Sequence, residues 1–139
     1  MDLDQVFIDE FGALSMDIQA SDLQGRIQMF FRLIKQRVTL EELAETFGVK
    51  NQDIDAALEN FRVLGVVEET EEDGQPVFIF KGYPEEMKEI VDLFPERKKR
   101  LETSVKTLEQ QVEKAQEEGQ NVDKHVAVLK DVKKDFGIS

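Results

Sequence analysis

Residues 39–69 read TLEELAETFGVKNQDIDAALENFRVLGVVEE, and this stretch decides the fold. Thr39 is followed three residues later by Glu42, a capping-box pattern that predicts the start of a helix. Gly48 and Gly65 each follow an apolar stripe at helical spacing, and glycine readily ends a helix in the left-handed conformation. The pattern predicts a helix over 39–47, a tight turn, and a second helix from about Asn51 to residue 64.

The residues after Gly65 change to a period of two. The runs VVEET (66–70) and PVFIF (76–80) are rich in residues that favour strands, and EEDGQ (71–75) separates them. Its Asp73-Gly74 pair is a strong signal for a two-residue hairpin turn. We therefore expect a two-stranded wing after the second helix.

Two more amphipathic helices are predicted before this unit. A leading helix is indicated within residues 1–20 by apolar residues spaced three and four apart, namely Leu3, Val6, Phe7, Phe11 and Leu14. Ser21 with Gln24 forms a second cap pattern, and a dense apolar face then continues to about Arg37. The second helix is expected to be central to the core.

The C-terminal part is predicted to be helical throughout. Pro84 is placed as a first helical residue, Pro95 interrupts or kinks that helix, and a final helix runs from Val122 after a break at Gly119. From Leu101 to Ala115 apolar residues recur at alternating spacings of four and three, which is a heptad seam. The seam is too short to be stable alone, so the final helix, the leading helix or another copy of the chain must cover it. We expect another copy, with a dimer interface at Leu101, Val105, Leu108, Val112, Ala115, Val126 and Leu129.

The fold class expected is mainly α with a small β-hairpin wing, a winged helix-turn-helix with N- and C-terminal dimerisation helices. Three segments are predicted. Residues 1–20 form an N-terminal amphipathic helix, 21–83 the winged helix-turn-helix domain, and 84–139 a C-terminal helical dimerisation arm.

The stretch 39–69 resembles the helix-turn-helix of the multiple-antibiotic-resistance regulator (MarR) superfamily. The matching positions are Leu43-Ala44, Phe47-Gly48-Val49, Ile54, Leu58 and Leu64-Gly65-Val66-Val67. GRI at 25–27 and EEMKEIVDLFPERKKRLE at 85–102 look like the glycine-betaine-synthesis regulator (GbsR) branch. The resemblance implies a homodimer whose terminal helices pair and a winged helix that binds operator DNA, hence a dimeric transcriptional regulator.

The charge of the predicted reading surface departs from that family pattern. Residues 50–81 carry three basic and eight acidic side chains, a local charge of -5, in a chain whose formal charge is -12. Carboxylates repel phosphates, so affinity from this face is expected to be poor. The residues expected to contact DNA are Lys50, Asn51, Gln52, Asn60 and Arg62, with Arg32, Lys35 and Arg37 as phosphate clamps.

The same charge leaves an alternative function open. An acidic winged-helix module could dock on a basic protein, or imitate DNA towards a DNA-binding protein, without binding DNA itself. Six phenylalanines have two possible uses. We expect them to fill the core, and the alternative is that they line a cavity for an apolar or quaternary-ammonium ligand. These are Phe30, Phe31, Phe47, Phe61, Phe78 and Phe80.

Other classes of function find little support in the composition. The 139 residues include no cysteine and one histidine, so thiolate chemistry is excluded and a transition-metal site is not expected. Neither a nucleotide-binding glycine motif nor a nucleophile elbow is present. We expect a cytoplasmic protein that is not an enzyme, needs no cofactor and does not bind membranes.

Overall fold

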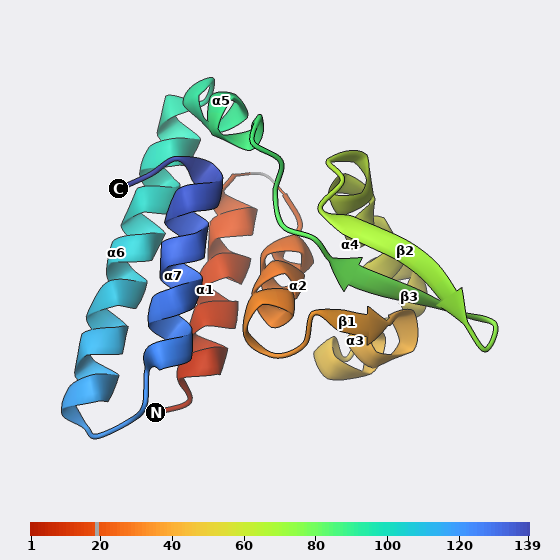
Figure 1. Ribbon diagram of the computed structural model, residues 1–139, viewed down its shortest axis with the longest axis horizontal. Coiled ribbons are helices and arrows are strands. Elements are labelled where there is room, and N and C mark those ends of the chain that lie inside the picture. Colours follow the sequence, from red (N-terminus) through yellow and green to blue (C-terminus); the bar gives the residue numbers. More distant parts are fainter. Residues whose placement is uncertain (19) are drawn as a thin grey trace.

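Three long helices form a layer beside a smaller unit of helices and sheet in the computed structural model, which describes residues 1–18 and 20–139 (Figure 1). The layer consists of α1 (Leu3–Asp17), α6 (Pro95–Glu117) and α7 (Asp123–Phe136). The smaller unit consists of α2 (Asp22–Leu33), β1 (Arg37–Thr39), α3 (Leu40–Phe47), α4 (Asn51–Val63), β2 (Val67–Glu72) and β3 (Gln75–Phe80). Residue 19, within the predicted segment 1–20, lies outside the described residues.

The helix-turn-helix forms where its local signals predict it. The Glu42 backbone N–H donates to Thr39 Oγ1 over 3.0 Å, and the Thr39 N–H donates to Glu42 Oε1 over 3.4 Å, so the capping box is confirmed. Gly48 ends α3 with φ 65°, a left-handed conformation that glycine adopts without a Cβ clash. The three-residue connection Gly48–Lys50 then leads into α4.

The wing forms as predicted, but it belongs to a sheet with a third strand. Asp73 and Gly74 both have positive φ, 51° and 78°, as the favoured two-residue hairpin turn requires. β3 lies between β2 and β1 and pairs antiparallel with both, with Val38 opposite Phe78. The predicted continuation of a helix to Arg37 is wrong, because α2 ends at Leu33 and Arg37–Thr39 pair with β3 instead.

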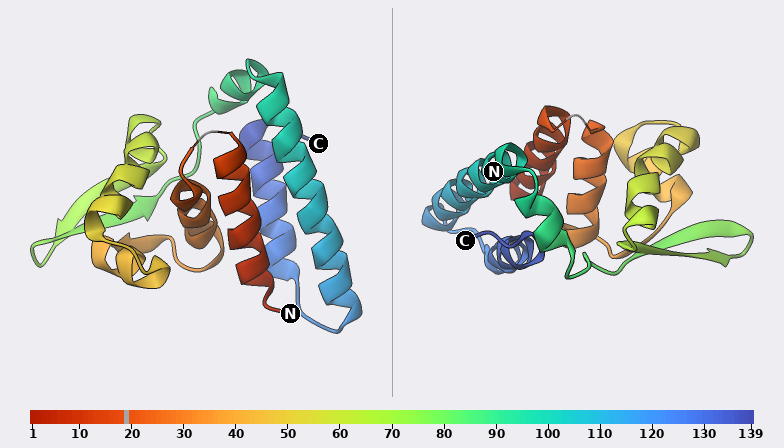
Figure 2. Two further views of the ribbon diagram at one scale, coloured as in Figure 1. Left: turned by 180° about the vertical axis from the view of Figure 1, so that it is seen from behind. Right: turned by 90° about the horizontal axis from the view of Figure 1, so that it is seen from above.

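Residues 81–94, between the wing and the three-helix layer, begin their helix later than predicted. Pro84 does not begin a helix; α5 (Met87–Asp92) begins three residues later, after a turn in which the Met87 N–H donates to the Pro84 carbonyl over 3.0 Å. Pro95 is the first residue of α6, as its missing N–H allows, so the predicted interruption is confirmed. Figure 2 shows α5 beside the start of α6, where the chain passes from β3 to the three-helix layer.

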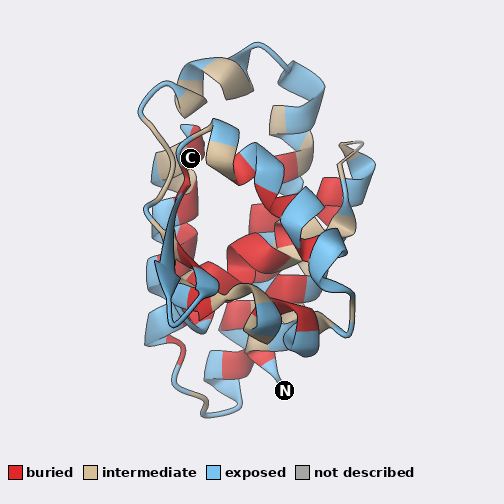
Figure 3. Ribbon diagram, turned by 90° about the vertical axis from the view of Figure 1, so that its right-hand side faces the viewer, coloured by how far each residue is buried: buried red, intermediate tan, exposed pale blue. Residues whose placement is uncertain are grey.

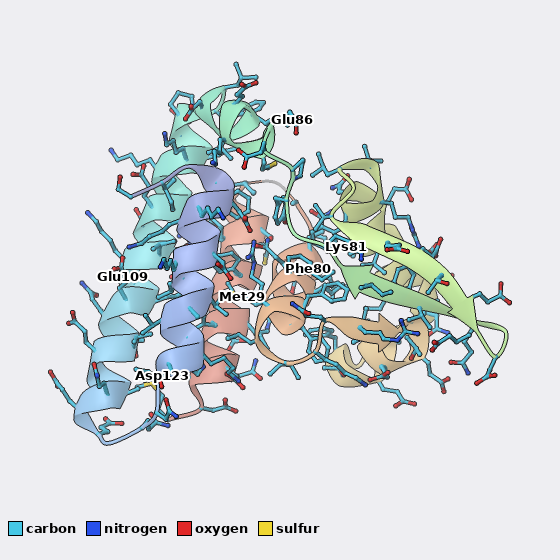
Figure 4. The ribbon with its side chains drawn as sticks, in the orientation of Figure 1. Met29, Phe80, Lys81, Glu86, Glu109 and Asp123 are labelled. Carbon is cyan, nitrogen blue, oxygen red and sulfur yellow. The ribbon has the colours of Figure 1, made fainter. Side chains whose placement is uncertain are left out.

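α2 contributes to two hydrophobic cores. Met29 and Leu33 pack into the core of the three-helix layer, whereas Ile27, Phe30 and Phe31 pack into the core of the winged unit. Figure 4 shows Met29 directed from α2 towards the layer and Phe80 lying between α2 and the sheet. Because one helix supplies both cores, a displacement of α2 must disturb packing on both sides.

The heptad seam is covered within the chain. Six of the seven residues predicted at a dimer interface are buried in the core shared by α1, α6 and α7, and Val126 is the exception at 53% exposed. We expected a second copy of the chain to cover this seam. Instead, the leading helix α1 and the final helix α7 of the same chain cover it. Among the described residues, no helix is both long and apolar enough to cross a membrane.

Candidate nucleic-acid interface

α4 has one buried and one exposed face. Ile54 is fully buried against the winged-unit core, while a continuous strip of α4 is exposed on the opposite side. That strip consists of Gln52, Asp55, Ala56, Glu59 and Val63. The adjoining β2–β3 hairpin is also exposed along most of its length, as Figure 3 shows. Helix and wing therefore present one accessible surface.

The start of α4 offers the donors that are best placed for a groove. Lys50 is the N-cap residue, and Asn51 and Gln52 occupy the first turn, where backbone N–H groups are not used within the helix. All three side chains are exposed, and among the residues the structure describes Lys50 takes part in no ion pair. Asp53 caps the Lys50 N–H over 3.3 Å, which leaves one carboxylate at the same helix end.

The other basic side chains of this surface are already held by carboxylates. Arg62 is surrounded by three acids, with Nη1 3.1 Å from Glu59 and Nη2 3.5 Å from Glu69, and it also pairs with Asp55. Its guanidinium lies 5.4 Å from the centroid of the Phe78 ring. The remaining pairs are Lys35–Glu42 at 2.7 Å, Arg37–Glu72, and Lys81–Glu68 at 3.1 Å.

Arg32 lies inside the molecule rather than on the exposed surface of α4 and the wing. Its side chain is 4% exposed, and its Nη2 lies 2.9 Å from Asp135 Oδ2 on α7. Its Nε donates to Gln28 Oε1 over 3.1 Å, and the guanidinium lies over the rings of Phe80 and Tyr83. The prediction that Arg32 clamps a phosphate therefore does not fit the fold, because the guanidinium joins α2 to α7.

Asn60 lies away from the start of α4, beside a cleft that the sequence does not predict. The cleft has a volume of about 370 Å³ and is bordered by the ends of α1 and α4, by α2 and α5, and by the start of α6. Its floor is apolar, with Phe11, Phe61 and Leu101 buried. Tyr83 also lines the cleft, and burial raises the pKa of its phenol, while Arg32 lowers this pKa and Asp135 raises it to smaller degrees.

The six phenylalanines discussed above fill the core. All six belong to the winged-unit cluster or pack against it, and only Phe61 reaches the cleft as well. Within residues 1–18 and 20–139, no group of three acidic or histidine side chains is placed to hold a metal ion. The lone histidine, His125, lies with Nε2 2.7 Å from Asp4 Oδ1 and stacks edge-on against Phe7, where it joins α7 to α1.

Comparison with solved structures finds a similar fold. A solved structure described as "Crystal Structure of a transcriptional regulator" superimposes with a TM-score of 0.52 at 19% sequence identity. The alignment covers 78% of this chain and 89% of the other. No protein-family model and no curated protein matches the sequence. At this identity the match establishes a shared fold, which is mainly helical with a small three-stranded antiparallel sheet.

Proposed function

We propose that this protein is a winged-helix transcriptional regulator that binds double-stranded DNA. The observation that carries the proposal is the exposed start of α4, where Lys50, Asn51 and Gln52 project from a helix-turn-helix beside a wing. A helix placed in this way enters the major groove in winged and unwinged helix-turn-helix proteins. The solved structure described as a transcriptional regulator supports the proposal through its similar fold.

The contacts divide into two classes by chemistry. Asn51 and Gln52 carry amides that read base edges, whereas Lys50 is a point charge for phosphate. The paired residues Lys35, Arg37 and Arg62 add little in their present geometry, because phosphate must displace a carboxylate from each. DNA binding is therefore expected to be weak outside a specific site and to depend on few phosphate contacts.

Binding to genomic fragments and to random duplex DNA, measured by fluorescence anisotropy over a salt series, tests the proposal. Lys50→Ala should weaken binding to every DNA sequence and should reduce the slope of log K against log salt concentration by about one. Gln52→Ala should instead reduce the difference in affinity between DNA sequences. Lys106→Ala, an exposed lysine on α6, is the matched control and should change neither.

Absence of any complex at low salt would overturn the proposal. Capture of a basic protein through β2 in a pull-down would instead support the acidic protein-binding module. Substitution of Glu68, Glu69, Glu71 and Glu72 by Gln distinguishes the two, because it should abolish capture of a basic protein but strengthen binding to DNA.

We also propose that the protein acts as a homodimer, as the family resemblance implies. The heptad seam is covered within the chain, so the proposed contact is the exposed face of α7 around Val126. Val126→Glu should then shift sedimentation equilibrium towards the monomer, while Ala56→Glu, at an exposed position of α4 in the winged unit, serves as the control. Equal masses for wild type and V126E would exclude this surface.

A further inference from the structure

We propose that the DNA site contains an adenine read by Gln52 and, roughly one or two base steps away, a thymine whose methyl group contacts Ala56. The inference rests on the proposed function, because it names the bases that the exposed face of α4 recognises. Three properties of α4 carry it, namely the exposure of its side chains, their charges and their ion pairs.

The exposed face of α4 consists of two neighbouring rows that differ in charge. Residues four apart lie on the same side of a helix, and all six members of the two rows are exposed. The uncharged row consists of Gln52, Ala56 and Asn60. The acidic row consists of Asn51, Asp55 and Glu59. Because carboxylates repel phosphates and the acceptor atoms of base edges, the uncharged row is the one suited to close approach.

α4 offers no free group of the kind that reads guanine. Guanine presents only acceptors, N7 and O6, in the major groove, and arginine or lysine most often pairs with them. Arg62 is the single arginine of α4, which contains no lysine. Its guanidinium is held by Asp55, by Glu59 at 3.1 Å and by Glu69 at 3.5 Å. Guanine is therefore disfavoured where α4 contacts the bases, while Lys50 precedes the helix as the proposed phosphate contact.

The amide of Gln52 has the chemistry that matches adenine. Adenine presents the N7 acceptor beside the N6 donor, and a glutamine side chain supplies one donor and one acceptor to this pair. Within residues 1–18 and 20–139, the Gln52 amide has no hydrogen-bond partner that a base would need to displace, unlike that of Gln28, which accepts from Arg32. Asn51 carries a similar amide but lies in the acidic row, four residues before Asp55.

Ala56 places a methyl group one turn further along the uncharged row. Cβ atoms four residues apart on a helix are about 5–6 Å from one another, and bases rise about 3.4 Å per step along a strand. Gln52 and Ala56 therefore meet bases roughly one or two steps apart. Thymine carries a methyl group on its major-groove edge, and alanine contacts this group without leaving a polar atom unpaired. The structure thus favours a half-site rich in A·T pairs.

Selection from a random duplex library identifies the preferred site, and a variant assigns the adenine within it. Wild type should enrich a site that contains adenine and thymine at the stated spacing. Gln52→Arg should change one adenine of that site to guanine, because arginine pairs with N7 and O6 of guanine. Lys106→Ala, which removes an exposed lysine of α6, is the matched control and should select the wild-type site.

Modified bases then test each contact at the level of single atoms. 7-Deazaadenine lacks the N7 acceptor, and at the assigned position it should weaken binding of wild type by about tenfold but leave that of Gln52→Ala unchanged. Deoxyuridine lacks the thymine methyl group and should weaken binding of wild type by about fourfold, but not that of Ala56→Gly. Circular dichroism checks that A56G folds, and the losses in wild type test both contacts without any variant.

The outcomes separate this inference from the proposed function. A selected site that Gln52→Arg leaves unchanged, equal affinity of wild type for the 7-deazaadenine or deoxyuridine site, or binding without sequence preference would overturn the base assignment while DNA binding itself stands. Absence of any complex at low salt would overturn the proposed function and the base assignment together.

Discussion

Arg32 and Asp135 lie 103 positions apart in the sequence and form an ion pair of 2.9 Å at the boundary between α2 and α7. The Arg32 side chain is 4% exposed and that of Asp135 21%, so the pair is largely removed from water. Tyr83 lies under the guanidinium and packs against Phe136, with 4.8 Å between ring centroids. This contact fastens the winged unit to the three-helix layer.

Breaking that pair should destabilise the protein strongly. Arg32→Ala leaves Asp135 with a partly buried, uncompensated charge, and we expect a loss of about 3 kcal/mol in the free energy of unfolding. Urea denaturation measures it. Lys35→Ala, which removes the exposed pair with Glu42, is the control and should cost less than about 1 kcal/mol. Equal losses in both variants would contradict the special role of Arg32.

Gly25 should tolerate no side chain. A Cβ at this position would lie 1.8 Å from the Phe11 carbonyl oxygen, so α1 and α2 would have to separate. We expect Gly25→Ala to cost about 3 kcal/mol or more, at the upper end of the range for overpacking, as measured by urea denaturation.

Gly12 provides the matched control on the facing helix. A Cβ there would meet Arg26 side-chain atoms at 2.9–3.2 Å, and such a flexible side chain can move. Alanine is favoured over glycine within a helix by up to about 1 kcal/mol, so Gly12→Ala should stay within about 1 kcal/mol of wild type. A cost similar to that of Gly25→Ala would show that close packing at Gly25 is not the cause.

Two adjacent acids on α1 should respond to pH in opposite directions. The Arg26 hydrogen bond, with help from Gln5, lowers the pKa of Asp9. Ionised Asp9 therefore stabilises the folded state at pH values above its unfolded-state pKa. This stabilisation is lost as the pH falls through the folded-state pKa of Asp9. Asp9→Asn should lower the melting temperature at pH 7, and the difference from wild type should disappear in acid.

Glu10 behaves in the reverse manner. Partial burial raises its pKa, although Arg100 opposes this shift, so ionisation of Glu10 disfavours the folded state as pH rises. Glu10→Gln should raise the melting temperature at pH 7 and leave it unchanged in acid. Thermal melts from pH 3 to 8 test both variants. A melting-temperature difference from wild type that has the same sign and the same pH dependence in both variants would contradict the opposite pKa shifts of Asp9 and Glu10.

Removal of the acids around Arg62 should increase DNA affinity if the proposed function holds. Glu59→Gln with Glu69→Gln removes two of its three carboxylate partners and two charges that repel phosphate. Anisotropy with random duplex DNA should show tighter binding and a steeper dependence on salt. Glu113→Gln with Glu117→Gln, on the distant part of α6, should leave binding unchanged (Figure 1).

Local signals in the sequence account for much of the winged unit. The Thr39–Glu42 capping box, the left-handed Gly48 and the Asp73-Gly74 turn each depend on residues within a few positions of one another, and the structure places each as predicted. β1 could not be found in this way, since three residues carry almost no periodicity and their pairing with β3 spans about 40 positions.

Two features of the structure depend on residues that are far apart in the sequence. These are the helices that cover the heptad seam and the ion pair that buries Arg32. An apolar stripe on α6 specifies that a helix must pack there, but it does not specify whether that helix comes from the same chain. Arg32 similarly reads as an exposed basic residue until α7 brings Asp135 beside it. The cleft has no signal in the sequence, because its lining comes from six separate segments brought together by the fold.

The order of strands gives the carboxylates of β2 a second effect. β2 lies at one side of the sheet, with β3 as its only partner in the described residues, so its outer row of backbone N–H and C=O groups is open. Such an edge invites hydrogen bonding with a strand of another molecule, and charged side chains prevent it. Glu68, Glu69, Glu71 and Glu72 therefore oppose intermolecular β-aggregation in addition to setting the charge of this surface.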